Sequence, residues 1–418
     1  MKPKIIKSEA PRPLAHYNEG AQVGPWIFPA GQIASDYKTG VAPAARRNPG
    51  FPYYGSDIKL QTRYVLENLR KTLAAAGSSF EHVVKAQVFL TDLKNFNGFD
   101  EIWREYFPVP PPRTTIGTTG LLVPGTLVEI DLIGYAPGQG VSHRVSTSAA
   151  PKPLANYTEA FVVGDLVFSA GQLASDFKSG VPAEAKLSPG FPYYGSEIKK
   201  QTHFILQNLK RTFEAAGSSL DDVFKAQVFL TNLTDFDDFD EVWKEYFKVR
   251  PARTTIGTTG LLVEGTLIEI DLIGHVSAAR SKKQVIKSSN PQPLANYTEA
   301  FRVGDLVFPA GQVASDFIDG LAKEAKVDPA FPFYQSAIKK QTRYILNNLK
   351  NTLEAAGSGL DHVIKAQVFL VDLKDFFAFD EVWQEFFPTP PPRTTVGTTG
   401  LLLDDALIEI DVVAAARS

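Results

Sequence analysis

Three arginines, each followed by two threonines, recur at one fixed spacing and are the first candidates for chemistry. Arg113, Arg253 and Arg393 are 140 residues apart (253 − 113 = 393 − 253 = 140), and RTTIGTTGLLV or RTTVGTTGLLL begins at each of them. A guanidinium group presents a planar fork that binds a carboxylate through two parallel hydrogen bonds. The arginine is therefore a candidate anchor for a small acid. The alternative is a structural ion pair with the acidic residue of a later strand, at Asp131, Asp271 or Asp411.

An acidic pair in the same later strand is the second candidate. The pairs are Glu129/Asp131, Glu269/Asp271 and Glu409/Asp411. Side chains at i and i+2 of a strand point to the same face of a sheet. If that face is solvated, each pair is the wet side of an antiparallel strand. If a neighbouring repeat covers it, the carboxylates repel, and one has a raised pKa suited to proton transfer.

Weaker candidates recur in all three copies. A tyrosine near the start of each copy is either a hydroxyl donor or a packed aromatic ring: Tyr17, Tyr157 and Tyr297. A glycine in each Ala-Gly-Gln segment would let a ligand approach a backbone N–H, at Gly31, Gly171 and Gly311. The aromatic loop Phe51–Ser56 and its copies could form a lid or pack between domains.

Metal and cofactor chemistry is not expected. None of the 6 histidines occupies the same position in all three copies, and the chain has 0 cysteines. A histidine general base or a metal site common to the repeats is therefore not expected. The sequence predicts neither metal nor cofactor.

The chain length and the net charge limit the possible domain organisation and the classes of partner. The 418 residues divide into repeats that we place at 1–138, 139–278 and 279–418. The expected linkers, 136–143 and 277–283, are short, rich in Gly, Ser and Ala, and not rigid. A net charge of −3 without a basic block argues against nucleic acid as a partner. The chain has neither a signal-peptide run nor about 18 consecutive apolar residues, so we expect no membrane partner and a cytoplasmic location.

The elements that must position these residues are clearest in the second repeat. Alternating Val and Phe predict a strand pair over Phe161–Ala170, turning at Gly164-Asp165. Apolar spacing predicts a helix over Glu197–Ala216, ending at Gly217. A strand is expected at Val223–Leu230, a second amphipathic helix at Phe236–Phe247 and a last strand at Thr266–Ile273.

This order, β-β-α-β-α-β, predicts an α+β domain with helices on one face of the sheet. The other face needs cover as well. Three copies in tandem predict that these faces pack together around a threefold pseudo-axis. Three separate domains on a string are the alternative.

The ordered motifs resemble the Rid family (reactive intermediate deaminases, YjgF type) three times over. In each copy the resemblance rests on the early Tyr, the Ala-Gly-Gln strand end and the KAQVFL strand at Lys85–Leu90. It continues through the Phe- and Trp-rich second helix, Pro-x-Arg-Thr-Thr and the Glu-Ile-Asp strand. The family implies chorismate-mutase-like α+β domains that form trimers, with active sites in the clefts between subunits. Here those clefts would lie between repeats 1 and 2, 2 and 3, and 3 and 1.

The resemblance also implies residue roles. The arginines would bind the substrate carboxylate, Tyr17, Tyr157 and Tyr297 would line the pocket, and the Gly31, Gly171 and Gly311 backbone would bind the ligand. Activation of water would fall to Glu129, Glu269 and Glu409. Two further triplets would contact the ligand: Thr115, Thr255 and Thr395, and Asp100, Asp240 and Asp380, which stand where many family members have Asn.

The function expected on this basis is hydrolytic deamination of an imine or enamine carboxylic acid, possibly aminomuconate-like, to a 2-oxo acid and ammonia. The partner would be a small carboxylate-bearing substrate, and the chain a monomeric pseudo-trimer. One alternative is hydrolysis of a cyclic amide by a serine and a lysine, with Ser35, Ser175 and Ser315 and Lys85, Lys225 and Lys365 as candidates. Another is non-catalytic binding of carboxylate metabolites. RNA cleavage finds little support in the charge balance.

Overall fold

The computed structural model describes residues 2–138 and 143–417. It contains three repeats that share one order of helices and longer strands. The first repeat consists of β1 (Lys4–Ile6), β2 (Gly20–Val23), β3 (Trp26–Pro29), β4 (Gln32–Ile33), α1 (Asp57–Ala75), β5 (Val83–Leu90), α2 (Phe96–Tyr106), β6 (Arg113–Gly117) and β7 (Val128–Tyr135).

The other two repeats follow the same order, except that the third has no named counterpart of β4 among its described residues. The second consists of β8 (His143–Ser146), β9 (Ala160–Val163), β10 (Leu166–Ser169), β11 (Gln172–Leu173), α3 (Glu197–Ala215), β12 (Val223–Leu230), α4 (Phe236–Tyr246), β13 (Ala252–Gly257) and β14 (Ile268–His275). The third consists of β15 (Lys283–Ile286), β16 (Ala300–Val303), β17 (Leu306–Pro309), α5 (Ala337–Ala355), β18 (Val363–Leu370), α6 (Phe376–Phe386), β19 (Arg393–Gly397) and β20 (Ile408–Ala415).

Each repeat builds one mixed sheet. In the first repeat the strand order is β1-β2-β3-β7-β5-β6, and short β4 also pairs with β7. Only the β5–β6 pair is parallel, as are its counterparts β12–β13 and β18–β19. The last strand lies beside the KAQVFL strand, with Glu129 opposite Phe89 and Asp131 opposite Gln87. This register places the acidic pair in the middle of the sheet.

The helices form because their apolar residues fall on one face. In α3, Ile205, Leu209 and Phe213 are fully buried at the i, i+4 spacing of a helical stripe. The helix ends before Gly217, which has φ +77° and supplies the left-handed turn. Burying each such side chain contributes about 1.5–3 kcal/mol relative to leaving it exposed.

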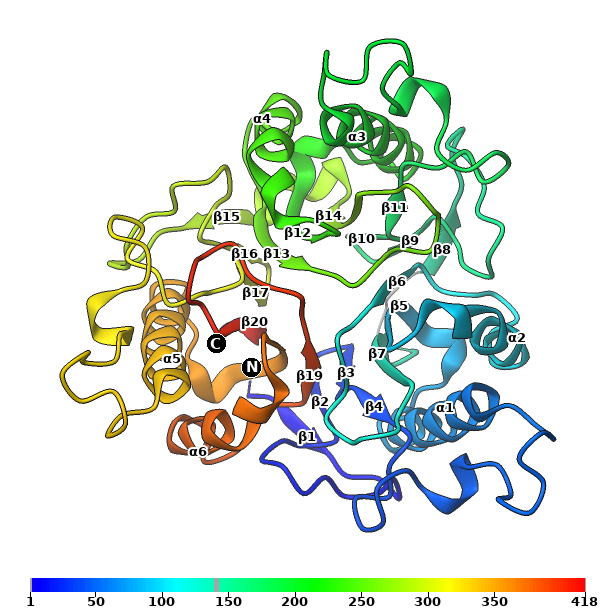
Figure 1. Ribbon diagram of the computed structural model, residues 1–418, viewed down its shortest axis with the longest axis vertical. Helices are drawn as coiled ribbons and strands as arrows, with labels where there is room; N and C mark the ends of the chain where they lie inside the picture. Colours follow the sequence, from blue (N-terminus) through cyan, green and yellow to red (C-terminus); the bar gives the residue numbers. More distant parts are fainter. Residues whose placement is uncertain (1, 139–142, 418) are drawn as a thin grey trace.

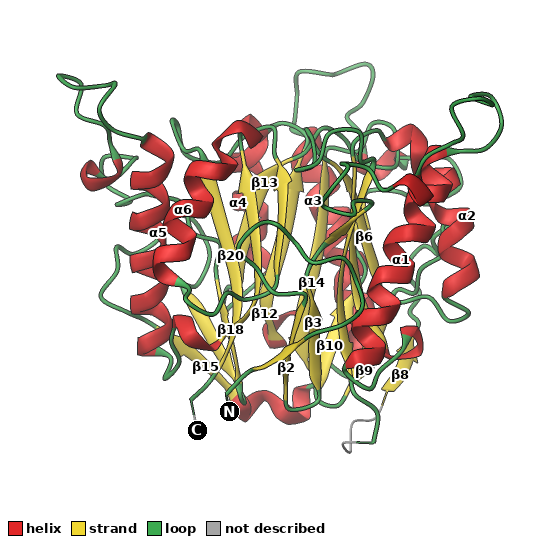
Figure 2. Cartoon of the chain, turned by 90° about the horizontal axis from the view of Figure 1, so that it is seen from below, coloured by secondary structure: helices red, strands yellow, loops and turns green. Residues whose placement is uncertain are grey.

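The three sheets surround a common axis and the helices lie outside (Figures 1 and 2). The inner faces meet in two apolar clusters built from all three repeats. One cluster includes Phe168, Phe224 and Phe308. The other includes Phe89, Phe229 and Phe369. The repeats are thus a packed pseudo-trimer of α+β domains, and the domains-on-a-string alternative is wrong.

The arginine itself lies on a strand that was not predicted from the sequence. β6, β13 and β19 pair in parallel with the KAQVFL strands and carry Arg113, Arg253 and Arg393. Each repeat also opens with a further strand, β1, β8 or β15, at the outer edge of its sheet.

The second linker is ordered, contrary to expectation. A short 3-10 helix spans Ser277–Lys282. Asp222 holds it, accepting hydrogen bonds from Arg280 Nε and Ser277 Oγ, both at 2.6 Å. Residues 139–142 of the first linker lie outside the described residues, and the boundaries at 138/139 and 278/279 stay predictions.

Candidate active site at the repeat interfaces

Each arginine is buried against the second helix of its own repeat. The side chain of Arg113 is 1% exposed, and its Nη2 lies 2.8 Å from Asp100 Oδ1 on α2. The equivalent ion pairs, Arg253–Asp240 and Arg393–Asp380, both measure 2.7 Å. The structural pairing with Asp131, Asp271 or Asp411 is therefore wrong. Asp100, Asp240 and Asp380 hold the arginines in place, and their contact with a ligand stays a prediction.

Aromatic rings also pack against each guanidinium group. Arg113 lies 5.0 Å from the Phe99 and Trp103 rings of its own repeat and 5.8 Å from the Tyr157 ring of the next repeat. Cation–π contacts of this kind favour the charged form. Burial lowers the pKa of Arg113 and the Asp100 carboxylate opposes this. The arginine therefore remains a cation that is buried among aromatic rings.

The arginines retain buried donors with no partner. Arg113 Nε, Arg253 Nη2, and Nε and Nη1 of Arg393 donate no hydrogen bond, and Arg253 Nη1 has only its ion pair with Asp240. Leaving a buried donor unpaired costs about 1–3 kcal/mol. The aspartate pair therefore does not use all of the arginine's hydrogen-bonding capacity.

The glutamate of the next repeat faces each arginine across the interface. Arg113, Tyr157, Gly171 and Glu269 line one cavity of ≈ 310 Å³ between repeats 1 and 2. A cavity of ≈ 240 Å³ between repeats 2 and 3 has Arg253, Tyr297, Gly311 and Glu409 in the same places. The third set joins repeats 3 and 1, since Arg393 lies 5.6 Å from the Tyr17 ring and Glu129 interacts electrostatically with Arg393. Each cleft therefore needs two repeats.

The acidic pair is buried, and this burial raises the pKa of its glutamate as expected. Glu129, Glu269 and Glu409 are 3–5% exposed. Burial, and secondarily the aspartate two residues away, raises the pKa of each glutamate to about 8. A backbone N–H of Thr395, Thr115 or Thr255 in the adjoining repeat opposes the rise. The glutamates thus hold a proton at neutral pH, as the covered-face hypothesis predicted.

Two of the three glycines do not offer a ligand the free backbone N–H that was predicted. The N–H groups of Gly171 and Gly311 donate to the carbonyls of Arg113 and Arg253 at 3.2 Å, so they are not free for a ligand. Instead, a Cβ on Gly171 would lie 2.0 Å from Glu269 Oε1. The equivalent separation is 2.4 Å at Gly31 and 2.1 Å at Gly311. Glycine is needed here so that the carboxylate can lie against the backbone.

The two threonines that follow each arginine lie in different places. One lines the cleft, and the other contacts an aspartate at the axis. Thr115 and Thr255 line the clefts and use their backbone N–H groups on the glutamates. Thr114, which sequence reasoning missed, donates from Oγ1 to Asp271 Oδ2 at 2.7 Å. Thr254 and Thr394 make the same contact with Asp411 and Asp131.

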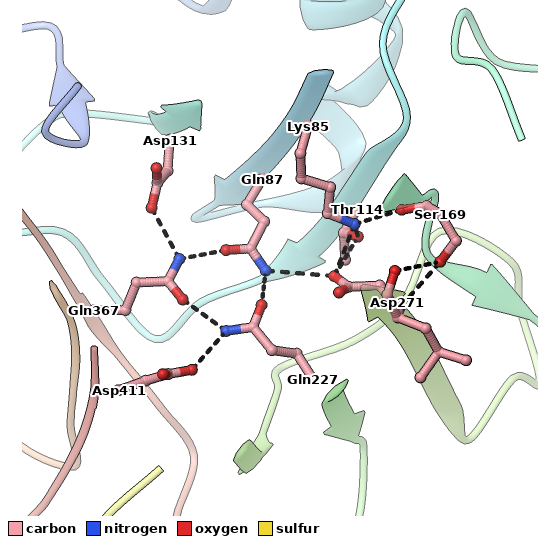
Figure 3. Close-up of polar contacts among 10 residues, drawn as sticks. Lys85, Gln87, Thr114, Asp131, Ser169, Gln227, Asp271, Gln367 and Asp411 are labelled. Carbon is pink, nitrogen blue, oxygen red and sulfur yellow. Dashed lines mark hydrogen bonds and ion pairs between the residues drawn. The ribbon is translucent and has the colours of Figure 1, made fainter. Parts of the chain in front are cut away.

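A closed polar ring on the axis was also missed. The side-chain amides of Gln87, Gln227 and Gln367 bond to one another in a circle (Figure 3). Each lysine pairs with the aspartate of the next repeat: Lys85 with Asp271 at 3.1 Å, Lys225 with Asp411 at 2.7 Å, and Lys365 with Asp131. Lysine and glutamine at i and i+2 of an otherwise apolar strand were the signal that could have revealed it.

The ring also decides against the serine–lysine alternative. The lysines are committed to the axis, whereas Ser35 Oγ donates to Gly40 O at 2.7 Å and accepts from Tyr37 N at 2.9 Å. Ser175 and Ser315 accept the equivalent N–H groups. Within residues 2–138 and 143–417, no hydrogen bond joins these serines to the lysines.

The aromatic loops do not pack between domains. Tyr53, Tyr193 and Phe333 at their tips are 93–95% exposed. Across the described parts of the chain, no group of three or more His, Cys, Asp or Glu residues could hold a metal ion. No described helix combines the length and apolarity needed to cross a membrane.

Comparison with known proteins identifies relatives of each repeat. A family model described as Endoribonuclease L-PSP matches residues 7–136, 147–276 and 287–416. A RutC family protein of Pyrococcus horikoshii is 36% identical over 135 residues, which is 32% of this chain and 98% of that protein. Chloroplastic Reactive Intermediate Deaminase A of Arabidopsis thaliana is 31% identical over 140 residues, which is 33% of this chain and 69% of that protein.

One solved structure resembles the assembly of repeats. A chorismatase crystal structure aligns with a TM-score of 0.51 at 13% identity, covering 80% of this chain and 93% of that chain. At this identity the likeness concerns the fold alone.

Proposed function

The chain belongs to the Endoribonuclease L-PSP family, the Rid proteins of the sequence resemblance, and we propose that it hydrolyses imine or enamine carboxylic acids. The products are a 2-oxo acid and ammonia. One observation carries this proposal. A buried glutamate that holds a proton to about pH 8 lines the same cleft as an arginine whose Nε has no hydrogen-bond partner. The name of the Arabidopsis relative supports the reaction class.

Substrate binding begins with the carboxylate. Arg113 already has Asp100 as a counter-ion, so the resident pair is neutral and an incoming carboxylate adds one negative charge. The protonated glutamate does not repel this charge. A charge-assisted hydrogen bond from Arg113 Nε to the substrate carboxylate then orients the C=N bond toward Glu269.

The protonated glutamate starts the chemistry. Glu269 gives its proton to the imine nitrogen, and the resulting iminium carbon becomes a better electrophile. The carboxylate then takes a proton from the water that adds to that carbon, forming a carbinolamine and restoring the acid.

Collapse of the carbinolamine uses the same group a second time. Glu269 protonates the amino nitrogen, ammonia leaves, and the carboxylate recovers the hydroxyl proton as the C=O bond forms. The sum is one imine and one water giving one 2-oxo acid and one ammonia. An enamine substrate first tautomerises to the imine.

The decisive experiment replaces each cleft glutamate by glutamine, which removes the acidic proton and keeps the shape of the side chain. A triple variant with Glu129→Gln, Glu269→Gln and Glu409→Gln should release ammonia from an enzymatically generated imino acid about 10²–10⁴-fold more slowly than the natural chain. The matched control changes three exposed glutamates at the same 140-residue spacing, Glu105, Glu245 and Glu385, to Gln. Natural rates in the first variant would refute the mechanism.

The same variants test the non-enzymatic alternative. If the natural chain binds a 2-oxo acid tightly yet accelerates no imine hydrolysis, the clefts are binding sites for carboxylate metabolites. Cleavage of RNA, which the family description names, is disfavoured by the net charge of −3. Incubation of the chain with single-stranded RNA tests it directly.

A further inference from the structure

The three clefts differ at a half-buried aromatic position. The residue is Tyr37 in the 3–1 cleft, Phe177 in the 1–2 cleft and Phe317 in the 2–3 cleft. All three have a left-handed backbone with φ of 55–56°, so the same local backbone presents each ring. Phe177 and Phe317 line the cavities that hold the arginine and the glutamate. The third cleft replaces this apolar ring edge with a hydroxyl.

The extra hydroxyl changes the polar surface of the 3–1 cleft. Tyr37 Oη lies 2.8 Å from Tyr17 Oη. In the other clefts, no hydrogen bond within the described residues engages the hydroxyl of Tyr157 or Tyr297. Burial, with Tyr17 and Glu129 as neighbours, raises the pKa of Tyr37 well above its usual value, so the hydroxyl stays protonated. The 3–1 cleft thus presents two linked hydroxyls near its glutamate.

The entrance of the same cleft is also distinct. One turn after the arginine-binding aspartate, the 1–2 cleft carries Arg104, which reaches Asp100 at 3.2 Å. The 2–3 cleft has Lys244 at that position and the 3–1 cleft has Gln384. Gln384 Nε2 donates to Asp380 Oδ2 at 3.3 Å. A neutral amide thus replaces a cation in the one cleft that also carries the second tyrosine.

We propose that the clefts divide substrates by side chain and that Tyr37 is the specificity residue. Resting on the proposed function, the 3–1 cleft takes imino acids whose side chain ends in a hydroxyl or carboxamide, which the Tyr17–Tyr37 pair binds. The 1–2 and 2–3 clefts take imino acids with apolar side chains, packed against Phe177 or Phe317. A buried hydroxyl facing an apolar group loses hydrogen bonds, and a phenyl ring facing an amide leaves that amide unpaired.

The test isolates one working cleft at a time. A variant with Glu269→Gln and Glu409→Gln keeps only the 3–1 cleft active, and one with Glu129→Gln and Glu409→Gln keeps only the 1–2 cleft. An amino acid oxidase generates the imino acids of glutamine and leucine, and kcat/KM is measured for each. We expect the glutamine-to-leucine ratio of kcat/KM to be at least about tenfold higher in the 3–1 cleft.

Reciprocal substitutions assign the preference to one residue. Tyr37→Phe in the 3–1 variant should lower that ratio toward the value of the 1–2 cleft, and Phe177→Tyr in the 1–2 variant should raise it. Equal ratios in the two parent variants, or a ratio that Tyr37→Phe leaves unchanged, would overturn the inference while leaving the deaminase proposal intact.

A structural readout separates failure of the inference from failure of the reaction. Crystals of the natural chain are soaked with the 2-oxo acid of glutamine or of leucine. The inference expects the glutamine-derived acid in the 3–1 cleft and the leucine-derived acid in the other two, even if no imine is turned over. Absence of the glutamine-derived acid from the 3–1 cleft, or equal occupation of all three clefts by both acids, contradicts it.

Discussion

Glu269 and Asp271 lie two residues apart on β14 and point to the same side of the sheet, but they meet different partners. Asp271 lies at the axis and pairs with Lys85 and Thr114 of the first repeat. Glu269 lines the cleft, and its Oε2 has no hydrogen-bond partner. Neighbouring carboxylates therefore have separate roles, one in assembly and one in proposed proton transfer.

The pH dependence of activity follows from the glutamate that must enter the reaction protonated. Because its pKa is about 8, we expect kcat/KM to be level below pH 7 and to fall about tenfold per pH unit well above 8. Ammonia release measured from pH 6 to 10, with the spontaneous hydrolysis subtracted, checks this. A rate that rises through pH 8 would mean that the carboxylate form begins the reaction.

The same group sets a pH dependence of stability with a defined sign. The folded pKa of about 8 exceeds the ordinary value of 4.5, so the stabilising contribution is complete below pH 4.5 and is lost as the pH rises through 8. The triple Glu→Gln variant should therefore have a higher Tm than the natural chain at pH 9. Thermal unfolding at pH 6 and 9 measures the change, and the Tm difference should grow between them.

The glycine beside the glutamate should be as sensitive as the glutamate itself. In a triple variant with Gly31→Ala, Gly171→Ala and Gly311→Ala, each new methyl group would lie 2.0–2.4 Å from a glutamate oxygen and displace it. We expect at least a tenfold loss of kcat/KM. Gly50→Ala with Gly190→Ala is the matched control, because the third repeat has Ala330 at that position. Full activity in the triple variant would show that the carboxylate position is not critical.

At the scale of elements, two strands and one helix of a single repeat position the arginine side of each cleft. The KAQVFL strand β5 aligns β6 in parallel, which sets Arg113 beside Ala86. Helix α2 then supplies both Asp100 and the aromatic wall. Because the anchor lies on a strand rather than on a loop, its position is fixed by the sheet.

The KAQVFL strands also carry the axial ion pairs, whose energetic cost can be measured. Lys85→Met leaves Asp271 buried without its cation, so the free energy of unfolding should fall by about 3–5 kcal/mol. Adding Asp271→Asn removes the stranded charge and should restore part of the loss. Urea unfolding of the two single variants and the double variant gives the coupling energy. A coupling near zero would show that the pair does not hold the repeats together.

At the scale of the molecule, every interface joins the same two surfaces. Gly117 N donates to Gly260 O, Gly257 N to Gly400 O and Gly397 N to Gly120 O, all at 3.1 Å. The near-identical RTT-GTTG segments are thus interface elements as well as part of the clefts. A head-to-tail interface of this kind closes after three units.

Because the interface closes after three units, it predicts how a single repeat expressed alone would assemble. Residues 143–277 expressed alone have their own core but expose the axial apolar face, so we expect them to form a homotrimer with three identical clefts. Light scattering coupled to size-exclusion chromatography measures the mass. A stable monomer would show that the linkers, and not the surfaces, hold the repeats together.

Much of the fold was predictable from local pattern. The strand Val223–Leu230 coincides with β12, and the helices expected from Glu197 and Phe236 begin at those residues, because apolar periodicity and a glycine stop are local signals. The strand of Arg253 was missed because its polar ARTTIG segment lacks apolar alternation, and only its neighbour β12 makes it a strand.

The sequence by itself determined the triplication, the residue types of the site and the pairing of two carboxylates on one face. Only the tertiary structure decided that Arg113 pairs with Asp100, that Asp271 belongs to Lys85, and that Gly171 makes room for a carboxylate. The reason is physical. Each of these contacts depends on groups that a sheet register or another repeat brings together. Side-chain partners so far apart along the chain produce no periodic pattern in the sequence.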